Sequence, residues 1–288
     1  MSNSLLVLCI RIAVFSLLCS PAFAQTAEQA RIWRDYMEWS KAQPAERSGL
    51  QEYRARLIQD GLTEAQADER IAIIPKLYRE YPAFRTEAAA LGFNRLYRTP
   101  GQTRFTTEPN AFLVSTVKTL KPGKALDVAM GQGRNAVYLA ANGWDVTGFD
   151  IAEEGLKVAA ENAAKFGARI TTVKAGFEDF DYGKERWDLI YFVYTDAPIV
   201  DPEYVSRICS ALKPGGMLLI DRPFRSLTDP EPGWPETEQD KINALLKAWS
   251  GLHIVFYEDT TGIADWQQTE ANRLEKKHRI VRLLARKP

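Results

Sequence analysis

The chain has 288 residues, of which 45% are hydrophobic and 26% charged, and its 37 Lys and Arg residues balance 37 Asp and Glu residues. This ordinary globular composition excludes disordered, collagen-like and coiled-coil architectures, and the length allows one large α/β domain with an appendage. A formal net charge of zero argues against a nucleic-acid partner, because phosphate neutralisation needs an excess of Lys and Arg on one face. Three Cys and two His leave little basis for a disulfide framework or a metal cage, so we predict no metal site.

Residues 1–24 have the pattern of a secretory signal peptide. The segment holds no acidic residue and one basic residue, Arg11, followed by an apolar run and the small-residue ending Ala22-Phe23-Ala24. Such an ending precedes signal peptidase cleavage, here before Gln25, so we expect a periplasmic or secreted mature protein. The alternative is an uncleaved membrane anchor with the rest of the chain in the cytoplasm, since about 20 apolar residues span a bilayer. Only in that case do we expect contact with a membrane.

Helical periodicity dominates residues 25–95, which we predict to be an appendage of three or four helices. Aromatic side chains such as Trp33 recur at helical spacing, and we expect this stripe to pack against the main domain. Breaks are expected at Pro44, at Gly61 with Thr63 as the next N-cap, and at Tyr81-Pro82.

Residues 96–109 are polar and interrupted by Pro and Gly, which predicts a loop or a lid. From residue 110 to residue 288, patterns typical of strands alternate with patterns typical of helices. Strands are expected at 125–129, 145–149, 169–173, 187–194, 217–220, 253–258 and 278–285, and helices at 134–142, 152–166, 203–212 and 238–249. This alternation predicts an α/β domain with a mostly parallel sheet covered by helices on both faces. Ligands of such sheets bind beyond the carboxyl ends of the strands.

A glycine loop after the first strand carries the strongest functional signal. The expected strand at 125–129 runs into Gly131-Gln132-Gly133, and a helix follows directly. Glycines at 131 and 133 let the backbone approach a ligand and adopt conformations that a Cβ would disfavour. Asp150 ends the next strand, close to the spacing of about 20 residues at which an acid meets ribose hydroxyls. The pattern therefore favours a nucleoside ligand.

The glycine spacing alone leaves two nucleoside ligands open, because Gly131-x-Gly133-x-x-Ala136 also fits the loose dinucleotide fingerprint. Asp127 lies just before the loop, where a carboxylate would repel a pyrophosphate but attract a cationic ligand. Residues 212–216 form a turn motif before the fifth strand, and the last two strands can form an antiparallel pair. These features favour S-adenosylmethionine over a nicotinamide cofactor.

The segment from Lys121 to Asp150 resembles the class I S-adenosylmethionine-dependent methyltransferases, and within them the tellurite-resistance methyltransferase branch. The resemblance covers about residues 108–286. It implies a Rossmann-like, seven-stranded and mostly parallel sheet with an antiparallel last strand.

The same resemblance implies roles for residues of the cofactor site. Gly131 and Gly133 would run under the methionine part, with Ala129 and Met130 in the same loop. Asp127 would support the ammonium side, Asp150 would hold both ribose hydroxyls, and Ile151 would flank the adenine.

Two positions depart from the family pattern. Ala129 stands where the first glycine of the loop is usual, and Gly176 stands where an acid is often found after the third strand. We therefore expect the adenine contacts to come from Phe177 or Glu178.

The acceptor side is less defined. The segment from Tyr194 to Pro198 lacks the Asn/Asp-Pro-Pro-Tyr/Phe signature that holds a planar nitrogen, which disfavours methylation of DNA bases and of glutamine. We name Tyr194 and Asp196 as candidate catalytic residues. The candidates for substrate binding are Tyr97, Arg104 and Phe105.

The sequence therefore predicts a methyltransferase that acts on a small-molecule acceptor by in-line transfer from S-adenosylmethionine, a reaction that asks little of protein side chains beyond positioning. A non-catalytic nucleoside-binding protein with the same fold and a nicotinamide-dependent oxidoreductase are the alternatives. No protein partner can be inferred.

Overall fold

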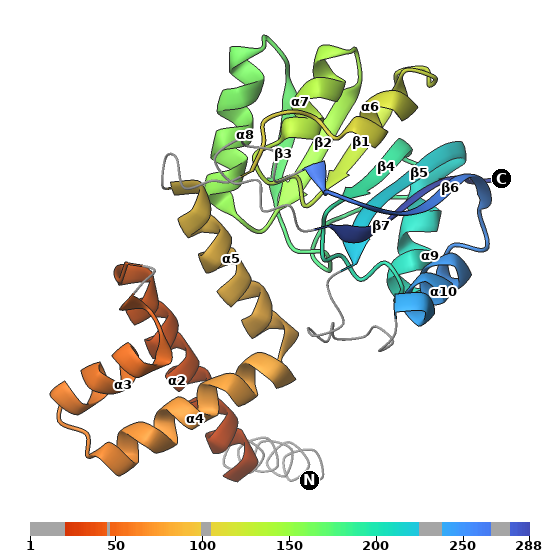
Figure 1. The fold of residues 1–288 in the computed structure, drawn as a ribbon. Coiled ribbons are helices and arrows are strands. Elements are labelled where there is room, and N and C mark those ends of the chain that lie inside the picture. Colours follow the sequence, from red (N-terminus) through yellow and green to blue (C-terminus); the bar gives the residue numbers. More distant parts are fainter. Residues whose placement is uncertain (1–20, 45–46, 99–104, 225–237, 266–276) are drawn as a thin grey trace, which may run out of the picture. The chain divides into compact units, whose positions relative to one another are not determined.

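A computed structural model describes residues 21–44, 47–98, 105–224, 238–265 and 277–288 (Figure 1). The chain divides into two compact units, residues 1–91 and residues 92–288. We call them the helical unit and the sheet unit, and each is described by itself.

The helical unit consists of α2 (Pro21–Ala42), α3 (Leu50–Gln59), α4 (Glu64–Glu80) and the first part of α5 (Pro82–Arg98). The helices end at the breaks expected from Pro44, Gly61 and Pro82. Thr63 is the N-cap of α4: its hydroxyl accepts a hydrogen bond from the Gln66 amide (3.3 Å), and its own amide donates to Gln66 Oε1 (2.9 Å). This reciprocal pair satisfies two backbone donors that the first turn of a helix leaves unpaired.

The apolar stripe of the helical unit builds a core within the unit, where the sequence predicted packing against the main domain. Trp33 and Tyr53 are fully buried, and Trp33 stacks on Phe84 with a distance of 4.7 Å between ring centroids. Around them pack Ile32, Met37, Leu57, Ala67, Ile74 and Leu77. Four short helices suffice to enclose this cluster, because each contributes one apolar face.

The sheet unit has the predicted seven-stranded sheet, with strand order β3-β2-β1-β4-β5-β7-β6 (Figure 1). Its strands are β1 (Lys124–Val128), β2 (Asp145–Asp150), β3 (Ile170–Lys174), β4 (Trp187–Val193), β5 (Leu212–Phe224), β6 (His253–Gly262) and β7 (His278–Arg286). The first five strands are parallel, and β7 runs antiparallel to both of its neighbours. The expected antiparallel last strand is confirmed.

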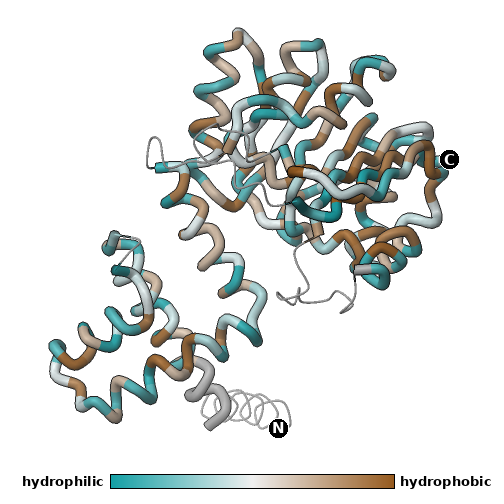
Figure 2. Tube along the Cα trace, viewed as in Figure 1, coloured by the Kyte–Doolittle hydropathy of each residue, from teal (hydrophilic) through white to brown (hydrophobic). Residues whose placement is uncertain are grey.

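Helices cover both faces of the sheet, because successive strand residues point to opposite sides. On one face Leu126, Ile190 and Leu218 pack with α9 (Pro202–Ala211) and α10 (Glu238–Ala248). On the other face Ala125 and Leu189 pack with α6 (Ala111–Val117), α7 (Arg134–Ala141) and α8 (Glu153–Lys165). Figure 2 shows hydrophobic residues concentrated along the strands between these layers.

The expected turn at residues 212–216 is part of β5. Leu212 pairs with Trp187 and Met217 pairs with Leu189, so residues 213–216 bulge out opposite a single residue, Asp188. Gly215 adopts a left-handed conformation there (φ +77°), which is why the local sequence is typical of a turn.

The loop expected from residue 96 begins later, because α5 continues through Arg98. Asn94 and Arg98 of this last turn contact α8, and these contacts stabilise helical backbone where the polar sequence predicted a loop. Residues 99–104 lie outside the described residues.

The signal-peptide prediction falls mostly on residues 1–20, which lie outside the described residues, and α2 begins at Pro21, before the expected cleavage position. Among the helices of the described residues, none has the length and apolar character needed to span a bilayer.

The Thr63 cap is a testable source of stability in the helical unit. Thr63→Ala removes the hydroxyl that accepts from Gln66, and we expect it to lower the free energy of unfolding by about 1 kcal/mol. Thr63→Ser keeps the hydroxyl and should change the stability by much less. Urea denaturation followed by far-ultraviolet circular dichroism measures both variants, and equal stabilities of the two would refute the capping role.

Candidate cofactor site and its surroundings

The glycine loop leaves β1 with a left-handed backbone at every second residue from Ala129 to Gly133. Ala129, Gly131 and Gly133 have φ angles of +58°, +52° and +74°, and the Met130 amide between them donates to the Phe149 carbonyl of β2 (3.0 Å). Ala129, at the position where the family usually has glycine, therefore adopts a conformation that costs a residue with a Cβ about 1–2 kcal/mol. The loop bends sharply at the carboxyl end of β1, where a ligand of a parallel sheet binds.

The two glycines of the loop make room for different neighbours. A Cβ on Gly133 would lie 2.7 Å from Ala159 Cβ of α8, so this glycine allows the loop to pack closely on that helix. A Cβ on Gly131 would instead collide with the Tyr97 hydroxyl. Gly131 therefore allows the Tyr97 hydroxyl to lie directly against the backbone of the glycine loop.

Asp150, the last residue of β2, joins the glycine loop to the start of α8. One oxygen, Oδ2, accepts a hydrogen bond from the Gly131 amide (2.8 Å), and Oδ1 accepts from the Ala152 amide (2.8 Å). The residue is 8% exposed, and burial raises the pKa of its carboxyl although both backbone bonds act in the opposite direction. Each carboxylate oxygen keeps a further lone pair with which it can accept a ligand hydroxyl.

Asp127 lies inside the sheet rather than on a ligand-facing surface, since it is 3% exposed. Burial raises the pKa of its carboxyl to about 7, and the nearby hydroxyl of Tyr191 offsets part of this effect. Neither Asp127 Oδ2 nor the Tyr191 hydroxyl has a hydrogen bond of good geometry among the described residues. A carboxylate beneath the glycine loop with an unpaired oxygen is suited to stabilise a positive charge above it.

The remaining cofactor candidates lie around this loop and after β3. Met130 is buried and packs on Gly148, whereas Ile151 and Phe177 are half-buried. Phe177 packs edge-on against Phe149 of β2 (6.2 Å between ring centroids). Glu178 is exposed and forms an ion pair with Arg207 (3.3 Å), so of the two residues expected at the adenine, Phe177 offers the apolar surface.

Tyr194, a candidate catalytic residue, follows β4 with a left-handed backbone (φ +56°). Its hydroxyl accepts a hydrogen bond from the Asp265 amide (3.2 Å), and the Arg134 guanidinium lies 5.7 Å from its ring centroid. Burial, with the charges of Asp221 and Asp265, raises the pKa of Tyr194 well above its usual value. Tyr194 therefore stays protonated at neutral pH and is suited to donate a hydrogen bond rather than to act as a base.

Of the other acceptor candidates, the structure brings Tyr97 and Phe105 together. Asp196 is exposed, and Arg104 lies outside the described residues. Phe105 is half-buried with its ring centroid 6.0 Å from that of Tyr97, and Tyr97 itself lies against the glycine loop.

A polar network beside Tyr194 escaped the sequence analysis. Asn110 caps α6 and donates from Nδ2 to both Asp221 Oδ2 (2.9 Å) and Asp265 Oδ2 (2.9 Å). Arg134 pairs with Asp265 Oδ1 (2.9 Å), and Arg282 lies 3.4 Å from Asp221 Oδ2. Burial raises the pKa of Asp221 to about 6 despite these partners. The network ties the end of β5 to the first residue of α7, directly after the glycine loop.

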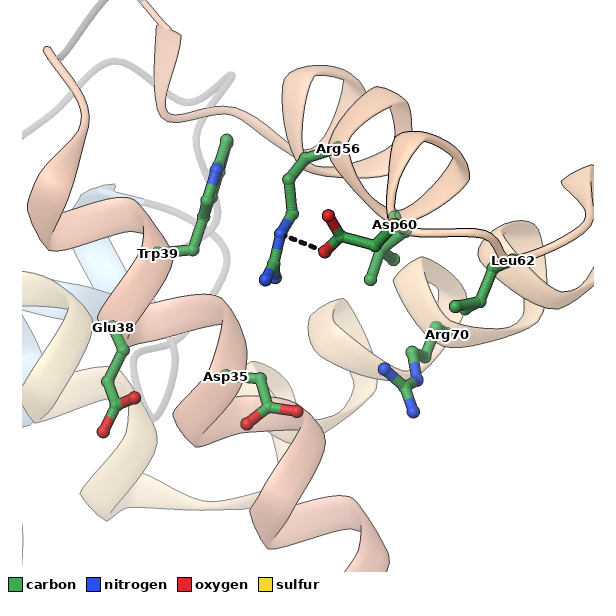
Figure 3. Close-up of a pocket in the computed structure, with 8 residues that line it drawn as sticks. Asp35, Glu38, Trp39, Arg56, Asp60, Leu62 and Arg70 are labelled. Atoms are coloured by element: carbon green, nitrogen blue, oxygen red, sulfur yellow. Dashed lines mark ion pairs between the residues drawn. The ribbon is translucent and has the colours of Figure 1, made fainter.

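A cavity of about 410 Å³ lies in the helical unit (Figure 3). Two Arg side chains from α3 and α4 face three acidic side chains, and Arg56 pairs with Asp60 (2.6 Å). Within the described ranges, no group of three or more His, Cys, Asp or Glu side chains is arranged to hold a metal ion.

The buried carboxyl of Asp127 predicts a pH-dependent stability. With a pKa of about 7 it keeps its proton in the folded protein at pH values where the unfolded chain has lost it, so wild-type stability falls between about pH 4 and pH 7. Asp127→Asn cannot ionise, and its free energy of unfolding should rise relative to wild type across that window by about 4 kcal/mol. Urea denaturation at several pH values measures the difference. Asp145→Asn, at the exposed start of β2, should show no such trend, and a constant difference for Asp127→Asn would contradict the prediction.

Comparisons with known proteins agree with this geometry. A family model described as "Methyltransferase domain" matches residues 125–216. The "Ubiquinone biosynthesis O-methyltransferase" of Vibrio vulnificus is 34% identical over 118 residues, which are 40% of this chain and 50% of that protein. The "Probable S-adenosyl-L-methionine-dependent methyltransferase TehB" of Haemophilus influenzae is 26% identical over 188 residues, 63% of each chain. The chain thus spans about half to two thirds of the length of these curated relatives.

A solved structure shares the fold of the sheet unit. The N-methyltransferase NodS from Bradyrhizobium japonicum, in complex with S-adenosylhomocysteine, superposes with a TM-score of 0.53 over 69% of this chain and 98% of its own, at 16% identity. The matched residues 125–216 contain the glycine loop, Asp127 and Asp150. Residues 125–216 of the sheet unit therefore match a methyltransferase domain, and the predicted resemblance to the class I S-adenosylmethionine-dependent methyltransferases, TehB proteins among them, is confirmed.

Proposed function

We propose that the protein transfers the methyl group of S-adenosylmethionine to a small-molecule acceptor by in-line displacement. The observation that carries the proposal is the buried Asp150 carboxylate at the end of β2, bonded to the Gly131 amide of the glycine loop within the matched domain. The residues fit the cofactor, because the Asp150 carboxylate beside the Gly131 amide keeps lone pairs for ligand hydroxyls and the buried Asp127 carboxyl favours a cation.

The chain's own residues bind and orient the reactants in this proposal. The cofactor supplies an activated methyl group on a sulfonium. Asp150 accepts hydrogen bonds from the ribose hydroxyls, and Asp127 stabilises the positive charge from beneath the loop. Tyr194, held protonated by its surroundings, donates a hydrogen bond toward the acceptor. A general base is needed only where the acceptor must lose a proton, so positioning supplies most of the rate.

The sequence and the relatives both support a small molecule as the acceptor. The segment after β4 lacks the Pro-Pro-aromatic signature for planar nitrogens, and one curated relative is named for ubiquinone biosynthesis. Both features support a small-molecule acceptor for this chain.

Replacing Asp150 tests the cofactor site. In Asp150→Asn an amide NH2 group takes the place of one carboxylate oxygen and faces either the Gly131 or the Ala152 amide, which leaves a buried donor without an acceptor. We expect the variant to bind S-adenosylmethionine 10- to 100-fold more weakly, the effect of about 1–3 kcal/mol. Isothermal titration calorimetry with S-adenosylmethionine and S-adenosylhomocysteine measures this loss.

The matched control is Asp145→Asn, which alters a carboxylate at the opposite, exposed end of the same strand and should bind as wild type does. Thermal denaturation shows whether each variant is folded. A folded wild-type protein that does not bind S-adenosylmethionine would refute the assigned cofactor, and titration with NADH would then test the oxidoreductase alternative. Binding without methyl transfer to any small acceptor would indicate a nucleoside-binding protein.

We also propose that residues 1–24 direct export, which makes the mature protein periplasmic or secreted. The support is the apolar run after Arg11 and the small-residue ending before Gln25. Mature protein recovered from fractionated cells should begin at Gln25 on N-terminal sequencing. Protein that retains residues 1–24 in the membrane fraction, with its remainder protected from external protease, would establish the anchor alternative instead.

A further inference from the structure

We propose that Tyr97, in the last turn of α5, is a cofactor-binding residue whose hydroxyl donates a hydrogen bond to an oxygen of S-adenosylmethionine. The proposal rests on the proposed function, and it moves Tyr97 from the acceptor side, where the sequence analysis placed it, to the cofactor side.

The position of the Tyr97 ring is set by two glycines. Its hydroxyl lies over Gly131 so closely that a Cβ there would collide with it. Its ring lies over Gly155 of α8, where a Cβ would stand 2.9 Å from Cε2 and 3.0 Å from Cδ2. The ring therefore spans from Gly155 of α8 to Gly131 of the glycine loop, beside the carboxyl ends of β1 and β2, where ligands of a parallel sheet bind.

The Tyr97 hydroxyl lacks a protein partner in the part of the chain that the structure describes. No hydrogen bond joins it to another described residue, although the side chain is half-buried. Burial and the neighbouring Asp150 carboxylate raise the pKa of Tyr97, so the group carries its proton at neutral pH. A bound ligand with acceptor oxygens would give this hydroxyl a hydrogen-bond partner within the protein site. S-adenosylmethionine offers a carboxylate and ribose oxygens as acceptors.

Two contacts hold the Tyr97 turn against the site. Asn94 Oδ1, one turn earlier on α5, accepts a hydrogen bond from the Glu154 amide (2.9 Å). Arg98, the next residue, pairs with the Glu154 carboxylate (3.2 Å). Glu154 lies in the first turn of α8, two residues after Ala152, whose amide donates to Asp150, so the Tyr97 turn is held against the backbone that follows the proposed ribose-binding carboxylate.

The test is Tyr97→Phe in the full-length protein, which removes the hydroxyl and keeps the ring between the two glycines. We expect the dissociation constant for S-adenosylmethionine, measured by isothermal titration calorimetry, to rise about tenfold, as for a lost hydrogen bond to a ligand. The control is Tyr138→Phe, which removes the hydroxyl of another half-buried tyrosine on α7 and should bind as wild type does. Thermal denaturation of both variants separates a loss of binding from a loss of folding.

The outcomes distinguish the two proposals. A folded Tyr97→Phe variant that binds S-adenosylmethionine as tightly as wild type, or more tightly, overturns the role of Tyr97 and leaves the proposed function standing. Equal weakening by Tyr97→Phe and Tyr138→Phe also overturns it. A wild-type protein that does not bind S-adenosylmethionine overturns both, because Tyr97 then has no such cofactor to contact.

Discussion

The hydrogen bond from the Gly131 amide to the Asp150 carboxylate is the constraint on which the site depends. It fixes the glycine loop of β1 to the end of β2, while the second carboxylate oxygen holds the Ala152 amide at the start of α8. Three elements that are separate in sequence thus meet at one side chain. Because the bonds act on backbone amides, the conformation of the loop is set before any ligand arrives, and a preorganised loop loses less freedom on binding.

The sheet also holds the residues of the site in place. Its central strands are buried on both faces, so their carboxyl ends cannot shift without disturbing two packed layers. The Asn110 amide bonds both to Asp221 near the end of β5 and to Asp265. Asp265 in turn forms an ion pair with Arg134, the first residue of α7. These contacts hold Arg134 over the Tyr194 ring. The residue after the glycine loop is therefore fixed in position relative to the residue after β4.

The sequence predicted those features that depend on neighbours along the chain. Strand and helix periodicity located all seven strands, and the glycine spacing with Asp150 located the cofactor loop, because these patterns arise from local backbone geometry. Gly215 misled the interpretation of β5, since a left-handed glycine in a bulge has the same local sequence as a turn. Tyr97 and Asp265 reach the site only through contacts with residues distant in sequence, and the composition around them carries no signal of that placement.

The electrostatics of the sheet unit distinguish between the two nucleoside cofactors that the glycine spacing leaves open. Burial raises the pKa of Asp127, Asp150 and Asp221. The protein alone therefore does not supply enough positive charge to offset the lost hydration of these three carboxylates. A dinucleotide would bring a pyrophosphate, and its negative charge would raise these pKa values further at a cost in affinity. A sulfonium with an adjacent ammonium brings positive charge and restores the ionised carboxylates. The same burial that lowers the stability of the protein as the pH rises therefore makes the site complementary to S-adenosylmethionine.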